Sequence, residues 1–329
     1  MTALTGWLGL VVGEWTINDD ARSCARRAVR AGRALGLRTL AVSTDEQCLA
    51  RLAGDGWSMR PAFTSDPAGL AAAFTPAWNR AVAPALLLGD GVNLSETTAR
   101  VVALLGGRTP DLDAVARCAE VIARHRVEAE RNGIPAGRYV AQAQDGEVIG
   151  IAEDVTVNGR GRDYDCPGSA DGRTGRALRA RVRAALDATR LTRGPVEVTV
   201  RADGRGVSVV DIAPGRINAC IASVVELATG YDPILAAVRA AATPGARPPV
   251  RRAVRRHACL RRGDMQAAPA YADAAWVGLP GLVSVRPGPD GVVVTVADDR
   301  ASAARAAESA VDRLSERTSL AAAASGGAR

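Results

Sequence analysis

Residues 194–232 read GPVEVTVRADGRGVSVVDIAPGRINACIASVVELATGYD. This stretch has the clearest pattern in the chain, and the interpretation of the other segments starts from it. Two apolar runs with a period of two, Val196–Val200 and Val207–Val210, flank the tetrapeptide at residues 202–205, which is Ala-Asp-Gly-Arg. Asp-Gly between alternating runs is a strong β-hairpin signal, because glycine tolerates the positive φ of a tight turn. The stretch therefore predicts two antiparallel strands, a turn at Pro214-Gly215 and then an apolar helix.

The same stretch carries the candidate site residues. Glu197 lies in the first predicted strand and Asp211 ends the second, so the two carboxylates can point to one side, as a hard cation such as Mg²⁺ requires. Arg216 and Asn218 lead into the helix. Cys220, near the helix start and close to Arg216, is either a nucleophile with a lowered pKa or a small buried apolar side chain. We take these five residues as the candidate catalytic set.

These residues resemble the C-terminal core of ATP-grasp enzymes, especially the biotin-carboxylase-like and amino-acid-ligase branches. Those enzymes have a Glu in one strand, Glu-x-Asn-Pro-Arg at the end of the next, and a helix closing on A-T-G-x-D. Here the corresponding residues are Glu197, the run D-I-A-P-G-R at 211–216, and A-T-G-Y-D at 228–232. The resemblance implies that the carboxylates and the Asn hold Mg²⁺ on nucleotide phosphates, and that the Arg contacts the substrate or acyl-phosphate.

Only part of that motif is retained. Glu197 and Asp211 match the metal ligands, if Mg²⁺ is retained, but Ala213 stands where the family has Asn. Gly215 is an extra residue before Arg216. The Glu-His pair that biotin carboxylases use on bicarbonate is replaced by Cys220-Ile221, so carboxylation of biotin is not expected.

The amino-acid composition limits which kinds of ligand and partner the protein is expected to bind. The 329 residues suffice for two or three subdomains, and all 42 basic residues are Arg. ATP-grasp enzymes hold phosphates with lysines, for which a guanidinium is not equivalent. The net charge is +7, but the basic residues are dispersed and aromatic residues make up only 3%, so we expect no nucleic-acid partner.

Cysteines and histidines give no metal signature. The six cysteines show no CxxC spacing, and His125 and His257 are far apart, so a zinc site is not expected. Reduced thiols indicate a cytoplasmic protein. Residues 1–13 are apolar but lack a basic start and are too short for a membrane span; we expect a first strand there and no membrane partner.

Strands and helices alternate in the N-terminal third, which predicts a parallel α/β layer. The expected strands are 7–12, 38–42 and 84–88, and the expected helices are 19–35, 45–53, 66–74 and 95–105. The layout resembles the N-terminal subdomain of biotin carboxylases, through V-G-E at 12–14, G-L-R-T-L-A-V-S at 36–43 and G-D-G-V-N-L-S-E at 89–96. The turn at 89–91 is either a ligand loop at a strand's carboxyl end or a simple connection.

The middle of the chain predicts a missing subdomain. A long helix at 111–132 ends in Gly133-Ile134-Pro135 and resembles an ATP-grasp segment, with Glu120-Val121 in place of its Asp-Lys. In that family a lid with a Gly-rich phosphate loop follows. Here residues 136–140 run directly into Gln142–Gly150, which resembles the strand after the lid. We therefore predict that the lid is deleted.

The remaining segments complete the expected fold. Residues 155–172 form a polar loop that either contributes Arg162, Asp163, Asp165 or Cys166 to a site or is disordered. Helices are expected at 171–191, 232–242 and 301–314, strands at 254–260, 282–286 and 292–296, and a disordered tail from Ala321.

The predicted fold class is α/β: a Rossmann-like pre-ATP-grasp domain, a reduced, lid-less ATP-grasp α+β core and a C-terminal cap. We expect the first domain at 1–107, a helical connector at 108–139, the truncated core at 140–250, the cap at 251–320 and the tail at 321–329.

Three functions remain open. The first is a repurposed enzyme of small-molecule metabolism that acts on a small carboxylate or acyl substrate without ATP, using two carboxylates with separated pKa values. The second is a non-catalytic scaffold or partner-binding protein. The third is an ATP-dependent carboxylate–amine ligase, the only one of the three that requires ATP and Mg²⁺ as cofactors. The resemblance also implies a homodimer, because biotin-carboxylase-like proteins often form one.

Overall fold

A computed structural model describes most of the chain, and every structural statement below concerns these residues. They are 6–11, 19–44, 46, 49–50, 58–62, 66–78, 82–88, 94–105, 112–131, 137–156, 162–167, 172–203, 206–242, 256–265, 281–286 and 288–326.

The N-terminal third forms a four-stranded parallel sheet in the order β3-β2-β1-β4, which confirms the predicted α/β layer. Its strands are β1 (Gly6–Val11), β2 (Arg38–Ser43), β3 (Ser58–Pro61) and β4 (Val82–Leu88). Its helices are α1 (Asp19–Ala34), α3 (Pro67–Trp78) and α4 (Leu94–Leu104). The sequence did not predict β3, because four residues that include Ser, Arg and Pro show no apolar alternation.

Several N-terminal predictions fall outside the described residues. The loop at 89–91 and the segment at 12–14 lie there, as does most of the helix expected at 45–53. These stay predictions.

The long connector helix is α5 (Leu112–Arg131), as expected. Five residues, 132–136, separate it from β5 (Gly137–Gln144), the first strand of the second sheet. The prediction of a deleted lid depends on this short interval.

The second sheet has eight strands in the order β11-β12-β10-β7-β6-β5-β8-β9, and all its pairs are antiparallel. Besides β5 it contains β6 (Glu147–Asp154), β7 (Tyr164–Cys166), β8 (Pro195–Asp203), β9 (Gly206–Pro214), β10 (His257–Met265), β11 (Leu282–Arg286) and β12 (Gly288–Ala297). The β8–β9 pair confirms the predicted hairpin, with Asp203 opposite Gly206.

Two expectations for this half need correction. The polar segment at 155–172 contains β7, which pairs with β6 and β10. This pairing joins strands of the predicted core and of the predicted cap into one continuous sheet, and the domain limits stay predictions. The tail expected to be disordered from Ala321 is helical as far as Gly326, because α10 (Arg300–Gly326) continues through an alanine-rich run of high helix propensity.

Helices cover both faces of the large sheet. On one face, α5 and α6 (Gly172–Thr189) bury the alternating valines of β8. On the other face, α7 (Ala219–Thr229) packs over β6, β7 and β10. Gly150 of β6 permits this approach, because a Cβ there would lie 2.6 Å from Cγ1 of Val225.

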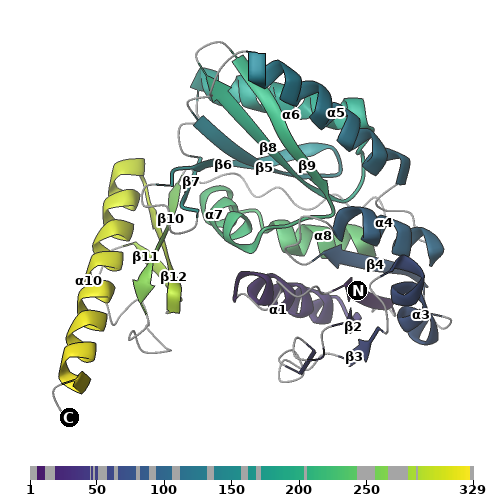
Figure 1. Cartoon of the computed structure of the whole chain (residues 1–329), viewed down its shortest axis with the longest axis horizontal. Helices are drawn as coiled ribbons and strands as arrows, with labels where there is room; N and C mark the ends of the chain where they lie inside the picture. Colours follow the sequence, from purple (N-terminus) through teal and green to yellow (C-terminus); the bar gives the residue numbers. More distant parts are fainter. Residues whose placement is uncertain are drawn as a thin grey trace.

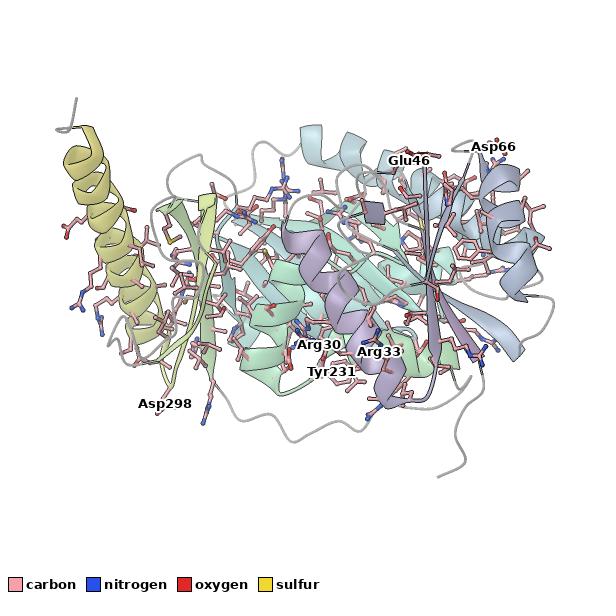
Figure 2. The ribbon with its side chains drawn as sticks, turned by 90° about the horizontal axis from the view of Figure 1, so that it is seen from below. Arg30, Arg33, Glu46, Asp66, Tyr231 and Asp298 are labelled. Atoms are coloured by element: carbon pink, nitrogen blue, oxygen red, sulfur yellow. The ribbon has the colours of Figure 1, made fainter. Side chains whose placement is uncertain are left out.

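The two sheets share a helical layer made of α1, α7 and α8 (Pro233–Ala242), which lies between them in Figure 1. Its core joins Leu8 of β1, Ala28 of α1, Ala222 of α7 and Ile234 of α8. Figure 2 shows Arg30 and Arg33 of α1 near Tyr231, in the turn between α7 and α8. The N-terminal sheet is therefore held against two helices that lie between β9 and β10 of the large sheet in sequence.

An ionic contact reinforces this layer. Arg27 of α1 pairs with Asp232 at 2.9 Å, pairs with Glu226 as well, and donates to the Ser223 hydroxyl at 3.2 Å. Asp232 also caps α8 by accepting from the backbone N–H of Ile234 at 2.9 Å. The A-T-G-Y-D motif thus ends in a residue that connects α1 with α8.

In the part of the chain that the structure describes, no single helix is long and apolar enough to cross a membrane. Only α7 together with the first eight residues of α8 meets the length and composition criteria, and this pair is bent by 102°.

Candidate functional site

The candidate site lies on the face of β5, β8 and β9 that is opposite α5 and α6. Val196, Val198 and Val200 point toward α5 and α6, so the alternate residues of β8 point the other way. Strand register places Glu197 opposite Gln142, and Thr199 opposite Asp211. We call this surface the polar face.

Three charged groups meet on the polar face. Nη2 of Arg216 lies 3.1 Å from Oε1 of Glu197, and Nη1 lies 3.6 Å from Oδ2 of Asp211. The Glu197 side chain is 3% exposed, that of Arg216 12% and that of Asp211 39%. We call these residues the charged triad; its formal charge is −1, and Asp211 is its most accessible member.

The turn after β9 places Arg216. Gly215 has φ of 77°, a left-handed conformation that other residues adopt only with strain, and its N–H donates to the carbonyl of Pro195 at 2.6 Å. The residue that is extra relative to the ATP-grasp motif thus supplies a turn, after which Arg216 reaches both carboxylates.

A buried amide completes the environment of Glu197. Nε2 of Gln142 donates to Oε2 of Glu197 at 2.9 Å, so both carboxylate oxygens are bound, one by an amide and one by a guanidinium. Gln144 lies two residues further along β5 on the same face and is 4% exposed. Neither polar atom of its amide has a hydrogen-bond partner among the described residues, so it is an unsatisfied donor and acceptor.

Neither glutamine belongs to the candidate set predicted from the sequence. The sequence pattern that indicates them is Gln142-Ala143-Gln144, which alternates polar and small apolar residues in a strand that is otherwise buried. Polar residues at every second position of a buried strand share one face, and each needs a partner.

The other two candidates lie at the start of α7. Asn218 is the N-cap residue, and its side-chain oxygen accepts from the N–H groups of Cys220 at 2.9 Å and Ile221 at 3.2 Å. Cys220 is 5% exposed, and its sulfur lies 3.5 Å from Nη2 of Arg262 on β10. Asn218 therefore stabilises the helix start, and Cys220 packs toward β10.

Asp163, Asp165 and Cys166 of the polar loop at 155–172 form contacts outside the charged triad. Asp165 of β7 binds Arg261 at 2.7 Å and Arg300 at 3.0 Å, on the face covered by α10. Asp163 accepts from the backbone N–H of Arg262 at 2.9 Å, and burial raises its pKa despite that bond. Cys166 is buried and donates to the carbonyl of Ile151, and burial raises the pKa of its thiol to about 12.

Both carboxylates that would hold Mg²⁺ are engaged by Arg216 in this arrangement. Among the described residues no group of three or more His, Cys, Asp or Glu side chains could hold a metal. The two carboxylates that resemble metal ligands are instead bridged by the guanidinium of Arg216. A divalent cation between them would face a fixed positive charge at short range, so Arg216 would have to leave first.

Comparison of the sequence with protein-family models and with curated proteins found no match. Solved structures do match over nearly the whole chain. The L-amino acid ligase from Bacillus licheniformis has a TM-score of 0.69 at 12% identity, covering 93% of this chain and 97% of that one.

Two further solved structures match this chain over a similar share of its length. The phosphoribosylglycinamide synthetase from Anaerococcus prevotii has a TM-score of 0.64 at 11% identity, covering 96% of this chain and 97% of that one. The ADP complex of an N5-carboxyaminoimidazole ribonucleotide synthetase has a TM-score of 0.65 at 10% identity, covering 96% and 99%. This chain therefore has an ATP-grasp-like fold, as its motifs indicated.

Proposed function

We propose that this protein is an enzyme that acts on a small carboxylate or acyl compound at the charged triad, without ATP. The observation that carries this proposal is the position of Arg216 between Glu197 and Asp211. A guanidinium there supplies a fixed cation at the place where the resemblance implies Mg²⁺.

Each member of the triad has a distinct role in this proposal. Glu197, buried and bound on both oxygens, holds Arg216 in place. Arg216 donates to the oxygen of a carbonyl group and stabilises the negative charge that develops there. Asp211, the accessible carboxylate, accepts or returns a proton. Because the triad carries a net charge of −1, it suits the carbonyl group that reacts, and a free carboxylate of the substrate would lie away from the triad.

A second candidate is an ATP-dependent carboxylate–amine ligase. It is favoured by the fold likeness to an L-amino acid ligase and to two synthetases over nearly the full chain. It requires that Mg²⁺–ATP displace Arg216 from the carboxylates. The short interval between α5 and β5 supports a missing lid and therefore favours the first candidate.

Calorimetric titration with ATP and Mg²⁺, repeated with ADP, separates the two. The first candidate predicts no saturable heat. It also predicts that a panel of small acyl and carboxylate compounds contains ligands that raise the melting temperature of the wild type more than that of Asp211→Asn. Saturable ATP binding in the micromolar range would establish the ligase instead. If neither the nucleotides nor any compound of the panel binds, the result would favour the non-catalytic scaffold protein.

The predicted homodimer and cytoplasmic location are retained as part of this proposal, as is the expectation that no nucleic acid or membrane is a partner. Size-exclusion chromatography with light scattering tests the dimer directly.

A further inference from the structure

A second charged group lies on the polar face, away from the triad. Four residues stand directly opposite one another on adjacent strands: Arg201 of β8, Arg138 of β5, Asp154 of β6 and Tyr164 of β7. Arg138 is four residues from Gln142 along β5, so it points to the same side. Arg162, just before β7, also approaches Asp154. We call Arg138, Arg162 and Arg201 the arginine row.

Positive charge exceeds negative charge in this row. The guanidinium groups of Arg138 and Arg162 approach the carboxylate of Asp154, and Arg201 lies opposite Arg138, so the row together with Asp154 has a formal charge of +2. Oδ2 of Asp154 lies 3.9 Å from Nε of Arg138 and 3.9 Å from Nε of Arg162, and its Oδ1 accepts from the hydroxyl of Thr156. These two ion pairs are long, so Asp154 compensates the arginines only in part.

The arginines are crowded and yet reachable from solvent. Nε of Arg138 is buried and has no hydrogen-bond partner among the described residues. The side chain of Arg138 is 31% exposed, and that of Arg162 is 47% exposed. Burial lowers the pKa of Arg138, and the neighbouring charges of Arg162 and Arg201 lower it further, against the opposing effect of Asp154. An anion would relieve this repulsion.

Tyr164 of β7 lies opposite Asp154, beside the row. Burial raises the pKa of its phenol, and the negative charge of Glu197 raises it further. The hydroxyl therefore stays protonated and can donate. Four residues along a strand span about 13 Å, so the row and the Glu197 end of the triad are separated by roughly that distance.

We propose that the arginine row binds an oxyanion, the carboxylate or phosphate group of a small ligand. The triad, at −1, disfavours an anion, whereas the row, at +2, attracts one, and guanidinium forks match either group. The ligand is then an elongated molecule whose acidic end sits on the row and whose carbonyl end reaches Arg216 and Asp211. This second part rests on the proposed function; the oxyanion site itself does not.

The test uses inorganic phosphate and succinate as probes, measured by calorimetry on the full chain. Wild-type protein should bind at least one of them saturably, and the stronger of the two identifies the acidic group. Arg162→Gln, at an exposed position that the fold tolerates, should weaken binding about tenfold, as loss of one charge-assisted hydrogen bond would. Arg138→Gln should do the same.

The matched control is Arg183→Gln, which removes one charge from the exposed surface of α6. It should leave binding unchanged, and Asp154→Asn should strengthen binding by removing the competing carboxylate. Arg216→Gln should still bind the probe, because the probe contacts the arginine row and not the triad. Failure of the proposed function at the triad can therefore be distinguished from failure of the oxyanion site. Equal weakening by Arg183→Gln, or no saturable binding by the wild type, would overturn the oxyanion site.

Discussion

At the scale of single residues, Arg216 determines the electrostatics of the site. Its guanidinium lies within 3.1 Å of one carboxylate and 3.6 Å of the other, which is the place a divalent cation would take between two carboxylates. Glu197 is almost fully buried, and burying an uncompensated carboxylate is costly. Arg216 is therefore needed both for the site and for the stability of the sheet around it.

Removing the charge of Arg216 should create a cation site. Arg216→Gln leaves Glu197 and Asp211 facing each other without a cation, so we expect a loss of about 3–5 kcal/mol in unfolding free energy. Millimolar Mg²⁺ or Mn²⁺ should restore part of it. Thermal unfolding with and without the metal measures this. The wild type and Arg183→Gln serve as controls; if Mg²⁺ stabilised them as much as the variant, Arg216 would not stand in for a metal.

At the scale of elements, α7 packs closely on β6 at Gly150, which lies opposite Gln142 of the polar face. Gly150→Ala would place a Cβ 2.6 Å from Val225, which forces α7 away from the sheet. We expect a cost of about 1–3 kcal/mol, as for other overpacked cores. Adding Val225→Ala should recover part of the loss, because it removes the clashing methyl groups. Chemical denaturation of the two single variants and the double variant gives the coupling energy; additive losses would contradict the clash.

A buried ion cluster fixes β7 against β10 and α10. Burial alone would raise the pKa of Asp165, but hydrogen bonds from Arg261 and Arg300 outweigh it and lower that pKa. A carboxyl whose pKa is lowered by folding contributes stability above its unfolded pKa, about 4, and loses that contribution as the pH falls further.

Asp165→Asn should therefore remove about 3–5 kcal/mol at pH 7, because it leaves Arg261 buried without its carboxylate. The difference from the wild type should shrink as the pH falls below about 4. Urea unfolding at a series of pH values measures this. Asp298→Asn, at an exposed position labelled in Figure 2, is the control and should change little. A pH-independent difference would show that packing, rather than charge, explains the loss.

At the scale of the whole molecule, the ATP-grasp-like fold is assembled around one shared helical layer. Arg27 joins α1 to Glu226 of α7 and to Asp232 at the start of α8, and the apolar core of the layer includes residues of β1, β2, α1, α7 and α8. The N-terminal sheet should therefore unfold together with the large sheet.

Arg27→Gln should loosen that coupling. We expect faster amide exchange in α1 and in the turn before α8, and a stability loss of about 1–3 kcal/mol, because Glu226 and Asp232 keep their charges without a partner between them. Hydrogen-exchange mass spectrometry measures the effect by segment. Arg30→Gln, an exposed change on the same helix, is the control. Exchange that rose evenly over both sheets would contradict a local connection.

The sequence by itself determined the elements and the family resemblance. Period-two valines around Asp-Gly predicted the β8–β9 hairpin, apolar segments separated by helices predicted the parallel layer, and D-I-A-P-G-R with A-T-G-Y-D indicated an ATP-grasp core. These features are local, because strand alternation and turn chemistry are written in neighbouring residues. The sequence did not predict the short strand β3, and the last helix is longer than the 301–314 expected.

Only the tertiary structure decided which charges meet. Gln142 and Glu197 are 55 positions apart, and Arg138, Asp154 and Arg201 come from three strands, so their contacts depend on strand register and not on sequence spacing. The left-handed turn at Gly215 directs Arg216 onto two carboxylates that the motif alone would assign to Mg²⁺. The chemistry of the polar face is therefore a consequence of pairing between distant strands.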